Sequence, residues 1–258
     1  MKDHRLTPLK SLLLVCCFVV VGVAGLLAAD PPEPPPLSGV IPAEDLVAQI
    51  KLYLTSFDEW LADEEQYKAN ALRVVRDANT LAVLSLVLCK HDAEHELKAS
   101  APALLAAARE LAAAEDFAAA KAAHAKVQAA ASASAGEAPV PKWEPVAALG
   151  QVMKQVTFVN NRLKRGMRRF DRLGEQNARD AAVLAAIAQA VTYDTHEVEK
   201  PEDVDQWYQF CGQMRDAAGE LNARIKSADK EGADAAMLKL SKSCDACHAA
   251  FRPDIAVE

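Results

Sequence analysis

Apolar residues recur at intervals of three and four positions along most of the chain, which is the spacing of one face of an α-helix. The pattern predicts helical stretches at about 43–62, 66–91, 101–115, 116–132, 145–171, 175–193, 201–228 and 233–251. Pro102 and Pro145 stand where two of these stretches begin, a common place for proline in a helix. Amphipathic helices with short connections favour antiparallel bundles, so the predicted fold class is all-α.

The two halves of this helical pattern repeat one another. Arg76-Asp77-Ala78 matches Arg179-Asp180-Ala181 when the sequence is displaced by 103 residues, without a gap in the surrounding alignment. The matched stretches also share their apolar pattern, which indicates an internal duplication. We therefore predict two antiparallel four-helix bundles in tandem, over residues 43–132 and 145–258, joined by a linker at 133–144.

The composition agrees with helices and excludes other classes of protein. The chain has 52 alanines and only 10 glycines in 258 residues, which favours helix over sheet. Its net charge of −7 gives an acidic surface, which argues against nucleic acid as a partner.

The N-terminus has the pattern of an export signal. Residues 1–10 carry three basic side chains, and residues 12–29 carry no charge. This is typical of a secretory signal peptide at 1–29, and the apolar run is also long enough for an uncleaved membrane anchor. Residues 30–42 (DPPEPPPLSGVIP) read as an extended, proline-rich linker. Either alternative places the body of the protein outside the cytoplasm, in the periplasm.

The candidate chemistry lies at Cys244-Asp245-Ala246-Cys247-His248, a CxxCH motif in the last predicted helix. CxxCH is the attachment sequence of c-type haem. On a helix the two thiols and the imidazole project from one face. The thiols could therefore bind the two vinyl groups of one porphyrin while His248 reaches the iron as an axial ligand.

Two other interpretations of the paired cysteines are weaker. A thioredoxin-like CxxC needs a βαβ context, which the pattern does not contain. A zinc site needs two further ligands, and the chain has no second CxxC. The sequence therefore predicts one covalently attached haem c per chain.

A CxxCH near the C-terminus of a helical bundle, followed by Phe251-Arg252, resembles the class II cytochromes c, the family of cytochrome c′. Residues 183–188 resemble the second helix of that family and residues 153–156 the first. The resemblance covers about 145–253 and implies an antiparallel four-helix bundle. In the first half, residues 128–132 (QAAAS) fall on the motif, so that bundle would be a degenerate copy without haem.

The family divides on the sixth ligand of the iron. Its gas-binding members leave that position open behind an apolar side chain, which the resemblance places at Val156. Its low-spin members use a methionine, and Met153, one turn earlier on the same apolar seam, is the alternative. His196 is a third option. Arg252 matches an arginine that lies near the haem in the family, or is simply a solvated helix-terminal residue.

Two other groups of residues are weaker candidates for a functional role. His91-Asp92-Ala93-Glu94-His95 fits the HxxEH pattern of some zinc peptidases, with both histidines on one helical face, but no third ligand is evident. Adventitious metal binding is an alternative, and a solvated helix end is the favoured interpretation. Cys89 and Cys211 fall in apolar helix, where a buried thiol is the usual state, and the compartment would permit a disulfide between them.

The function expected from the sequence is that of an exported c-type cytochrome. It would transfer electrons, or bind nitric oxide or carbon monoxide, at an iron held by His248, and it would not be an enzyme. The alternatives are a haem peroxidase or other oxidoreductase, and a haem subunit of a larger redox complex. The partners compatible with this function are an unidentified redox protein, small gases, and a second copy of the chain in a homodimer. The N-terminal segment could also anchor the protein to a membrane.

Overall fold

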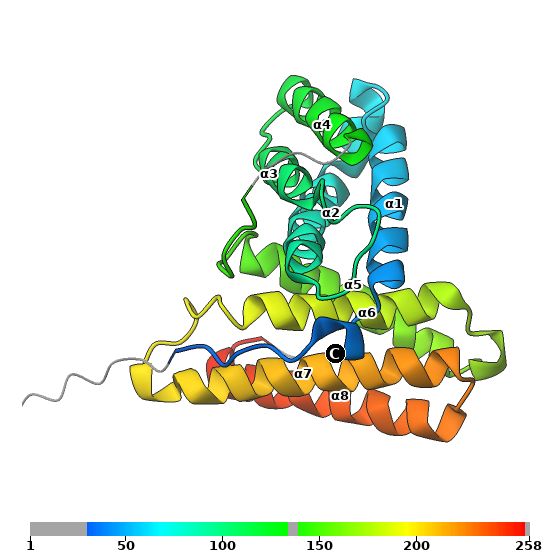
Figure 1. The fold of residues 1–258 in the computed structure, drawn as a ribbon, viewed down its shortest axis with the longest axis vertical. Helices are drawn as coiled ribbons and strands as arrows, with labels where there is room; N and C mark the ends of the chain where they lie inside the picture. Colours follow the sequence, from blue (N-terminus) through cyan, green and yellow to red (C-terminus); the bar gives the residue numbers. More distant parts are fainter. Residues whose placement is uncertain (1–29, 134–138, 256–258) are drawn as a thin grey trace, which may run out of the picture.

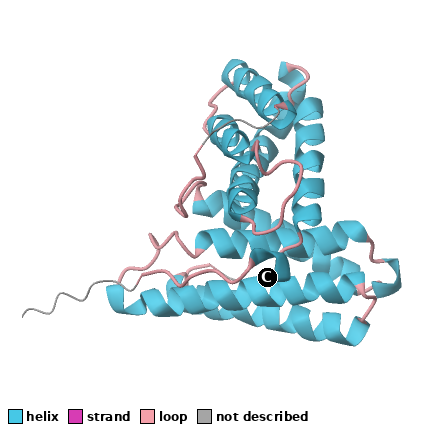
Figure 2. Ribbon diagram, viewed as in Figure 1, coloured by secondary structure: helices cyan, strands magenta, loops and turns pink. Residues whose placement is uncertain are grey.

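The computed structural model describes residues 30–133 and 139–255, and within these ranges the chain forms helices and loops without any strand (Figures 1 and 2). The α-helices are α1 Ala43–Trp60, α2 Glu64–Lys90, α3 Ala101–Ala112, α4 Phe117–Ser132, α5 Leu149–Met167, α6 Glu175–Val191, α7 Val204–Lys226 and α8 Lys230–Phe251. Three single-turn 3-10 helices accompany them, at Leu37–Gly39, Phe170–Arg172 and Pro201–Asp203. The all-α fold class is confirmed.

Aspartate side chains define the starts of three helices. Asp63, Asp116 and Asp229 precede α2, α4 and α8, and each accepts a hydrogen bond from a backbone N–H of the following turn. These bonds satisfy N–H groups that have no partner inside the helix. Such caps are local features of the sequence, so the helix bounds could be predicted to within a few residues.

The start of α5 differs from the prediction. The helix begins at Leu149, and Pro145 lies outside it. The backbone N–H of Ala148 instead donates to Oδ1 of Asn79 on α2, at 2.8 Å. This contact holds the segment before α5 against α2 in the first half of the chain. The helix consequently starts later than the sequence pattern predicts.

Helices that follow one another in the sequence pack together within each half of the chain. α1 lies against α2, α2 against α3 and α3 against α4, and the same order holds from α5 to α8. In Figure 1 the helices α1–α4 form the upper part of the molecule, with α1 upright, and α5–α8 lie beneath them. Among the described helices, α8 packs closely along α7 alone.

The two halves share one core, because α1 and α2 also pack against α5 and α6. Residues 77–89 of α2 and residues 180–191 of α6 are buried at every position. A helix that is covered on all sides needs apolar or small side chains all round. Each of these two helices is covered by its own half on one side and by the other half on the opposite side.

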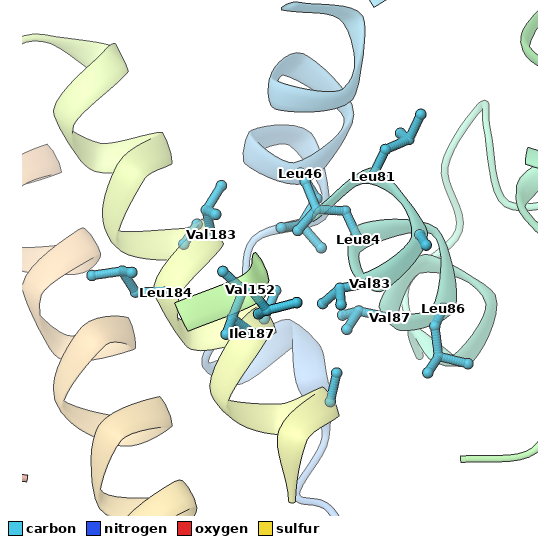
Figure 3. Close-up of a cluster of buried hydrophobic side chains, with 14 of the residues drawn as sticks. Leu46, Leu81, Val83, Leu84, Leu86, Val87, Val152, Val183, Leu184 and Ile187 are labelled. Carbon is cyan, nitrogen blue, oxygen red and sulfur yellow. The ribbon is translucent and has the colours of Figure 1, made fainter. Parts of the chain in front are cut away.

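Figure 3 shows this shared core, in which Val83 and Val87 of α2 face Val152 of α5 and Ile187 of α6. A polar contact crosses the same interface, where Nε2 of Gln155 on α5 donates to the hydroxyl of Tyr53 on α1 at 2.8 Å. Burial is the main cause that raises the pKa of Tyr53, so this hydroxyl stays protonated.

The end of the proline-rich segment is not a free spacer. Leu37 and Ile41 are buried, and Val40 lies against Gly219 of α7. The imidazole Nε2 of His91 hydrogen-bonds to the carbonyl of Ile41 at 2.8 Å. The expectation of an extended linker over 30–42 is thus wrong for its last residues, because their apolar side chains join the common core.

The predicted signal or anchor at 1–29 lies outside the described residues. In the part of the chain that the structure describes, none of the helices combines the length and the apolar character that a membrane crossing requires.

Candidate functional site

The CxxCH motif occupies the last two turns of α8. Cys244, Cys247 and His248 are all half-buried, and both cysteines pack against the hydrophobic core. Leu240 and Met237, which precede them on the same stripe of the helix, are buried. The helix thus turns the two thiols and the imidazole toward the protein interior, as the three–four spacing predicts.

The neighbours of the two thiols show where this face of α8 points. Cys247 lies near Cys211 of α7, and it contributes to raising the pKa of the Cys211 thiol. Cys244 lies near Lys164 of α5, whose charge acts on its thiol. The motif therefore faces the space between α5 and α7, inside the group of helices α5–α8.

Burial keeps these thiols protonated. It raises the pKa of Cys244, and it raises that of Cys247 to about 11. A redox-active CxxC depends on a depressed thiol pKa. The thioredoxin-like interpretation of the paired cysteines is consequently disfavoured by the environment of the thiols.

His248 carries an enclosed nitrogen without a partner. Its Nδ1 is shielded from solvent and makes no hydrogen bond within the described structure. Buried polar atoms of this kind are rare in folded proteins, because each costs free energy unless a partner is supplied. Two thiols and an unpartnered imidazole on one helical face are the donor set that could hold a covalently attached haem.

The apolar seam of α5 is largely buried. Val156 is buried, with 8% of its surface exposed, and Met153 is half-buried against the core. The ion pair between Arg162 and Asp180 fixes the register of α5 against α6.

Arg252 directly follows α8 and is held by two carboxylates. Its guanidinium pairs with Asp254 at 3.0 Å and with Glu197 at 3.4 Å. The hydrogen bonds that Arg252 donates to Asp254 are the main cause that raises the pKa of Arg252. The adjacent Phe251 packs edge-on against Trp207 of α7, which fixes the end of α8.

His196 is engaged by acidic side chains. Its Nδ1 lies 2.5 Å from Oδ1 of Asp194, and its Nε2 lies 3.4 Å from Glu197. The hydrogen bond with Asp194 is the first cause that raises the pKa of this imidazole. Iron binds the neutral imidazole, so these contacts disfavour His196 as a sixth ligand.

The HxxEH residues do not form the arrangement that their spacing suggested. α2 ends at Lys90, so His91 and His95 do not share a helical face, and that expectation is wrong. Nε2 of His91 donates to the Ile41 carbonyl, and its Nδ1 accepts from the N–H of Ala93 at 3.0 Å. Both nitrogens of His91 are thus used in fixing the end of α2, which leaves no lone pair for a metal.

Cys89 and Cys211 are free and buried, so the disulfide considered between them is absent from the described structure. Burial raises the pKa of Cys89 to about 11 and that of Cys211 to about 12. The closeness of Cys211 to Cys247 was not foreseen. Cys211 follows Trp207 by one helical turn on α7. This spacing is the sequence signal that could have placed Cys211 on the same inward face of the helix.

The motif and its surroundings are the basis for a functional assignment. Within residues 30–133 and 139–255, no group of three or more His, Cys, Asp or Glu side chains is placed to hold a metal ion. The candidate site is therefore the face shared by the CxxCH residues and the apolar seam of α5. No protein-family model, curated protein or solved structure matches this chain.

Proposed function

We propose that this protein is a class II c-type cytochrome that carries one haem bound covalently through Cys244 and Cys247. His248 would bind its iron in this proposal. The observation that carries it is the CxxCH motif on an inward face of α8, with the imidazole Nδ1 enclosed and unpartnered. The haem would supply an iron that exchanges electrons or binds a small gas.

The chain's own residues would position the group and control access to it. The seam of α5, with Met153 and Val156, presents apolar surface to the site and keeps water away. α8 has no closely packed helix other than α7 among the described helices, so α5 and α8 are free to flank a flat group. Arg252 and its carboxylates would fix the end of α8 beside it.

We also propose that the fold consists of two four-helix bundles in tandem that arose by duplication. The pairing of α1 with α6 mirrors that of α5 with α2, as expected if two copies of one unit meet face to face. Asp77 and Asp180, which the repeat aligns, are buried at the same place in α2 and α6. The first bundle would be a degenerate copy without haem.

Electron transfer or binding of nitric oxide or carbon monoxide suits this site better than turnover chemistry. A peroxidase needs an acid–base residue above the iron, and neither Met153 nor Val156 titrates. The basic, then apolar, N-terminal sequence supports a location in the periplasm, either after cleavage or with membrane anchorage. A haem subunit of a redox complex is a compatible role, with the first bundle as the surface for an unidentified redox partner.

Covalent attachment is tested on the exported full chain, produced in cells that attach haem to c-type cytochromes. The protein is precipitated in acid acetone, and haem in the pellet is measured as the pyridine haemochrome. We expect one haem per chain, and a large loss of retained haem in Cys244→Ala and Cys247→Ala. Cys211→Ala is the matched control, because this thiol lies beside Cys247 but outside the motif, and it should retain haem.

Complete release of haem from the wild-type pellet would contradict the proposal. A value of two haems per chain in the protein before extraction, with one left in the pellet, would instead show that the first half binds a second group non-covalently. His95 and His124 would then be the residues to test, since both nitrogens of His91 are already hydrogen-bonded.

A further inference from the structure

A cluster of basic side chains lies where α5 ends and the chain turns into α6. Residues 162–172 carry six basic side chains and one acidic side chain, in a chain whose net charge is −7. Four arginines of this stretch are exposed, and none of the four forms an ion pair with another described residue: Arg165, Arg168, Arg169 and Arg172. Their positive charge is therefore not neutralised within the described part of the protein.

The end of a helix explains only part of this charge. Basic side chains near the C-terminus of a helix interact favourably with its dipole, and Arg165 lies in the last turn of α5. Arg169 and Arg172 lie beyond that helix, where the effect of the dipole falls off. Neighbouring like charges also repel one another, and a partner of opposite charge would relieve this repulsion.

An exposed aromatic ring adjoins these arginines. Phe158 lies two turns before Arg165 on the same side of α5, and 42% of its surface is exposed. The guanidinium carbon of Arg76, from α2, lies 4.5 Å from the centre of this ring, and that of Arg162 lies 5.1 Å from it. Both guanidiniums are themselves held by buried aspartates, so they fix the ring in place.

α2 contributes a second exposed apolar side chain to the same surface. Leu72 is 85% exposed and lies one turn before Arg76 on the same side of α2. Long side chains on a helix lean toward its N-terminus, so Arg76 extends toward the turn of Leu72 while it stacks on Phe158. Leu72 and Phe158 are thus neighbours on one surface, with arginines beside them.

This surface lies far from the start of the described chain. The four exposed arginines precede α6, whereas Pro36 lies by its other end, where it lines a hollow with Trp143, and Trp143 stacks on Tyr193 with 5.0 Å between the ring centres. α6 has 17 residues, so these two ends of the helix are about 25 Å apart (Figure 1). An N-terminal anchor at 1–29 would hold the end near Pro36 at the bilayer, and the arginines would point away from the membrane.

We infer that the four exposed arginines, together with Leu72 and Phe158, form a docking surface for an acidic partner protein. Aromatic residues and arginine are enriched in protein interfaces, and exposed apolar side chains grouped together mark such sites. Leu72 and Phe158 provide the apolar centre, and the arginines pair with carboxylates of the partner. A small anion would use the arginines alone and leave both apolar side chains in water. The inference needs no haem and goes beyond the proposed function.

The test uses the full chain and, as the probe, a fluorescently labelled peptide of glutamates with two central leucines. Its affinity is measured by fluorescence anisotropy beside that of the same peptide without leucines. We expect the leucine-containing peptide to bind at least about fivefold more tightly, because its leucines contact the apolar centre. The affinity of both peptides should fall as the salt concentration rises, since exposed charges are screened.

The double variant Arg165→Gln, Arg169→Gln removes two of the four unpaired charges and should weaken the binding of both peptides about two- to tenfold. Phe158→Ala should remove most of the advantage of the leucine-containing peptide and leave the other peptide within about twofold. The matched control is Lys142→Gln, Lys200→Gln, which removes two exposed charges that also form no ion pair with a described residue. These lysines lie by the other end of α6, so this variant should bind both peptides as the wild type does.

Leu72→Ser provides a variant whose folding is not in question, because its side chain is almost fully exposed. It should weaken binding of the leucine-containing peptide at least about twofold and leave the other peptide unaffected.

Three outcomes would overturn the inference. The wild type could fail to bind either peptide at low salt, or the lysine control could lose as much affinity as the arginine variant. The wild type could also bind vesicles of phosphatidylcholine and phosphatidylglycerol through Phe158 and Arg165 but bind neither peptide, which would assign the surface to a membrane. None of these results affects the cytochrome proposal, which the pyridine haemochrome tests separately.

Discussion

Gly219 of α7 lies directly against Val40, so that a β-carbon added to this glycine would be 2.5 Å from Cγ1 and 2.6 Å from the carbonyl oxygen of Val40. Real β-carbons do not approach other atoms so closely. The absence of a side chain at Gly219 is therefore what allows the segment before α1 to dock on α7. Leu37 and Ile41 are buried as a result, although they belong to a stretch whose composition is typical of a linker.

Gly219→Ala should lower the free energy of unfolding by about 1–3 kcal/mol, because Val40 must move through its backbone to make room. The matched control is Gly212→Ala in the same helix, where the nearest atom to an added β-carbon is the end of the Arg215 side chain at 3.9 Å. That change should stabilise the protein by up to about 1 kcal/mol through helix propensity. Urea denaturation measures both, and equal stability of the two variants would refute the docking of the segment.

Asp180→Ala should be strongly destabilising. The Asp180 carboxylate is fully buried and binds the Arg162 guanidinium through both oxygens, and Gln176 donates to it at 2.9 Å. Removal of one partner of a buried pair costs about 3–5 kcal/mol, and we expect the lower end because Arg162 is partly exposed. Arg179→Ala, which breaks only an exposed pair with Glu175, should change stability by less than about 1 kcal/mol. A small effect at Asp180 in chemical denaturation would contradict this account of the core.

The sixth ligand of the iron can be assigned from absorption spectra. With Val156 over the iron, no protein atom binds there, so the ferric and ferrous haem should be high-spin and the ferrous form should bind carbon monoxide. Azide should bind weakly, because an anion loses its hydration on entering an apolar site. Met153→Ala should then leave the spectrum nearly unchanged.

If Met153 is the ligand instead, the wild type will be low-spin, with a methionine–iron charge-transfer band in the far red that Met153→Ala removes. A low-spin spectrum that persists in Met153→Ala would exclude both assignments. His196 would then be the next candidate for the sixth ligand.

Two histidines should change stability with pH in opposite directions. Burial is the main cause that lowers the pKa of His124, although Asp58 at 3.0 Å opposes it. The fold thus favours the neutral imidazole. Above the unfolded pKa of about 6.5 the imidazole of His124 is neutral in both states and does not alter the stability. Below that value the unfolded state binds the proton more readily, so the protein loses stability as the pH falls. His124→Gln should therefore reduce the loss of stability between about pH 7 and pH 5.

His196 provides the contrast. Its contact with Asp194 raises the folded pKa, so its stabilising effect is complete below the unfolded pKa and disappears as the pH rises through the raised value. His196→Gln should accordingly cost stability in mildly acidic solution and little in alkaline solution. Free energies of unfolding in urea at several pH values test both variants, and parallel pH profiles for the two would contradict these opposite directions.

The sequence alone was sufficient for the helices and for the candidate haem residues. Apolar periodicity and N-terminal aspartate caps act within a few residues of each helix end, so the bounds of α2, α4 and α8 could be read locally. The spacing of Cys244, Cys247 and His248 likewise determines, on any helix, that the three side chains share one face. These features need no knowledge of what surrounds them.

Only the tertiary structure determined which residues these helix faces contact. The start of α5 depends on Asn79 of α2, the end of α2 depends on the Ile41 carbonyl, and the burial of residues 37–41 depends on Gly219. It also decided that Nδ1 of His248 is enclosed without a hydrogen-bond partner within the described structure. Such relations join residues far apart in the chain, and they follow from the fit between helix surfaces, which periodicity within one helix does not specify.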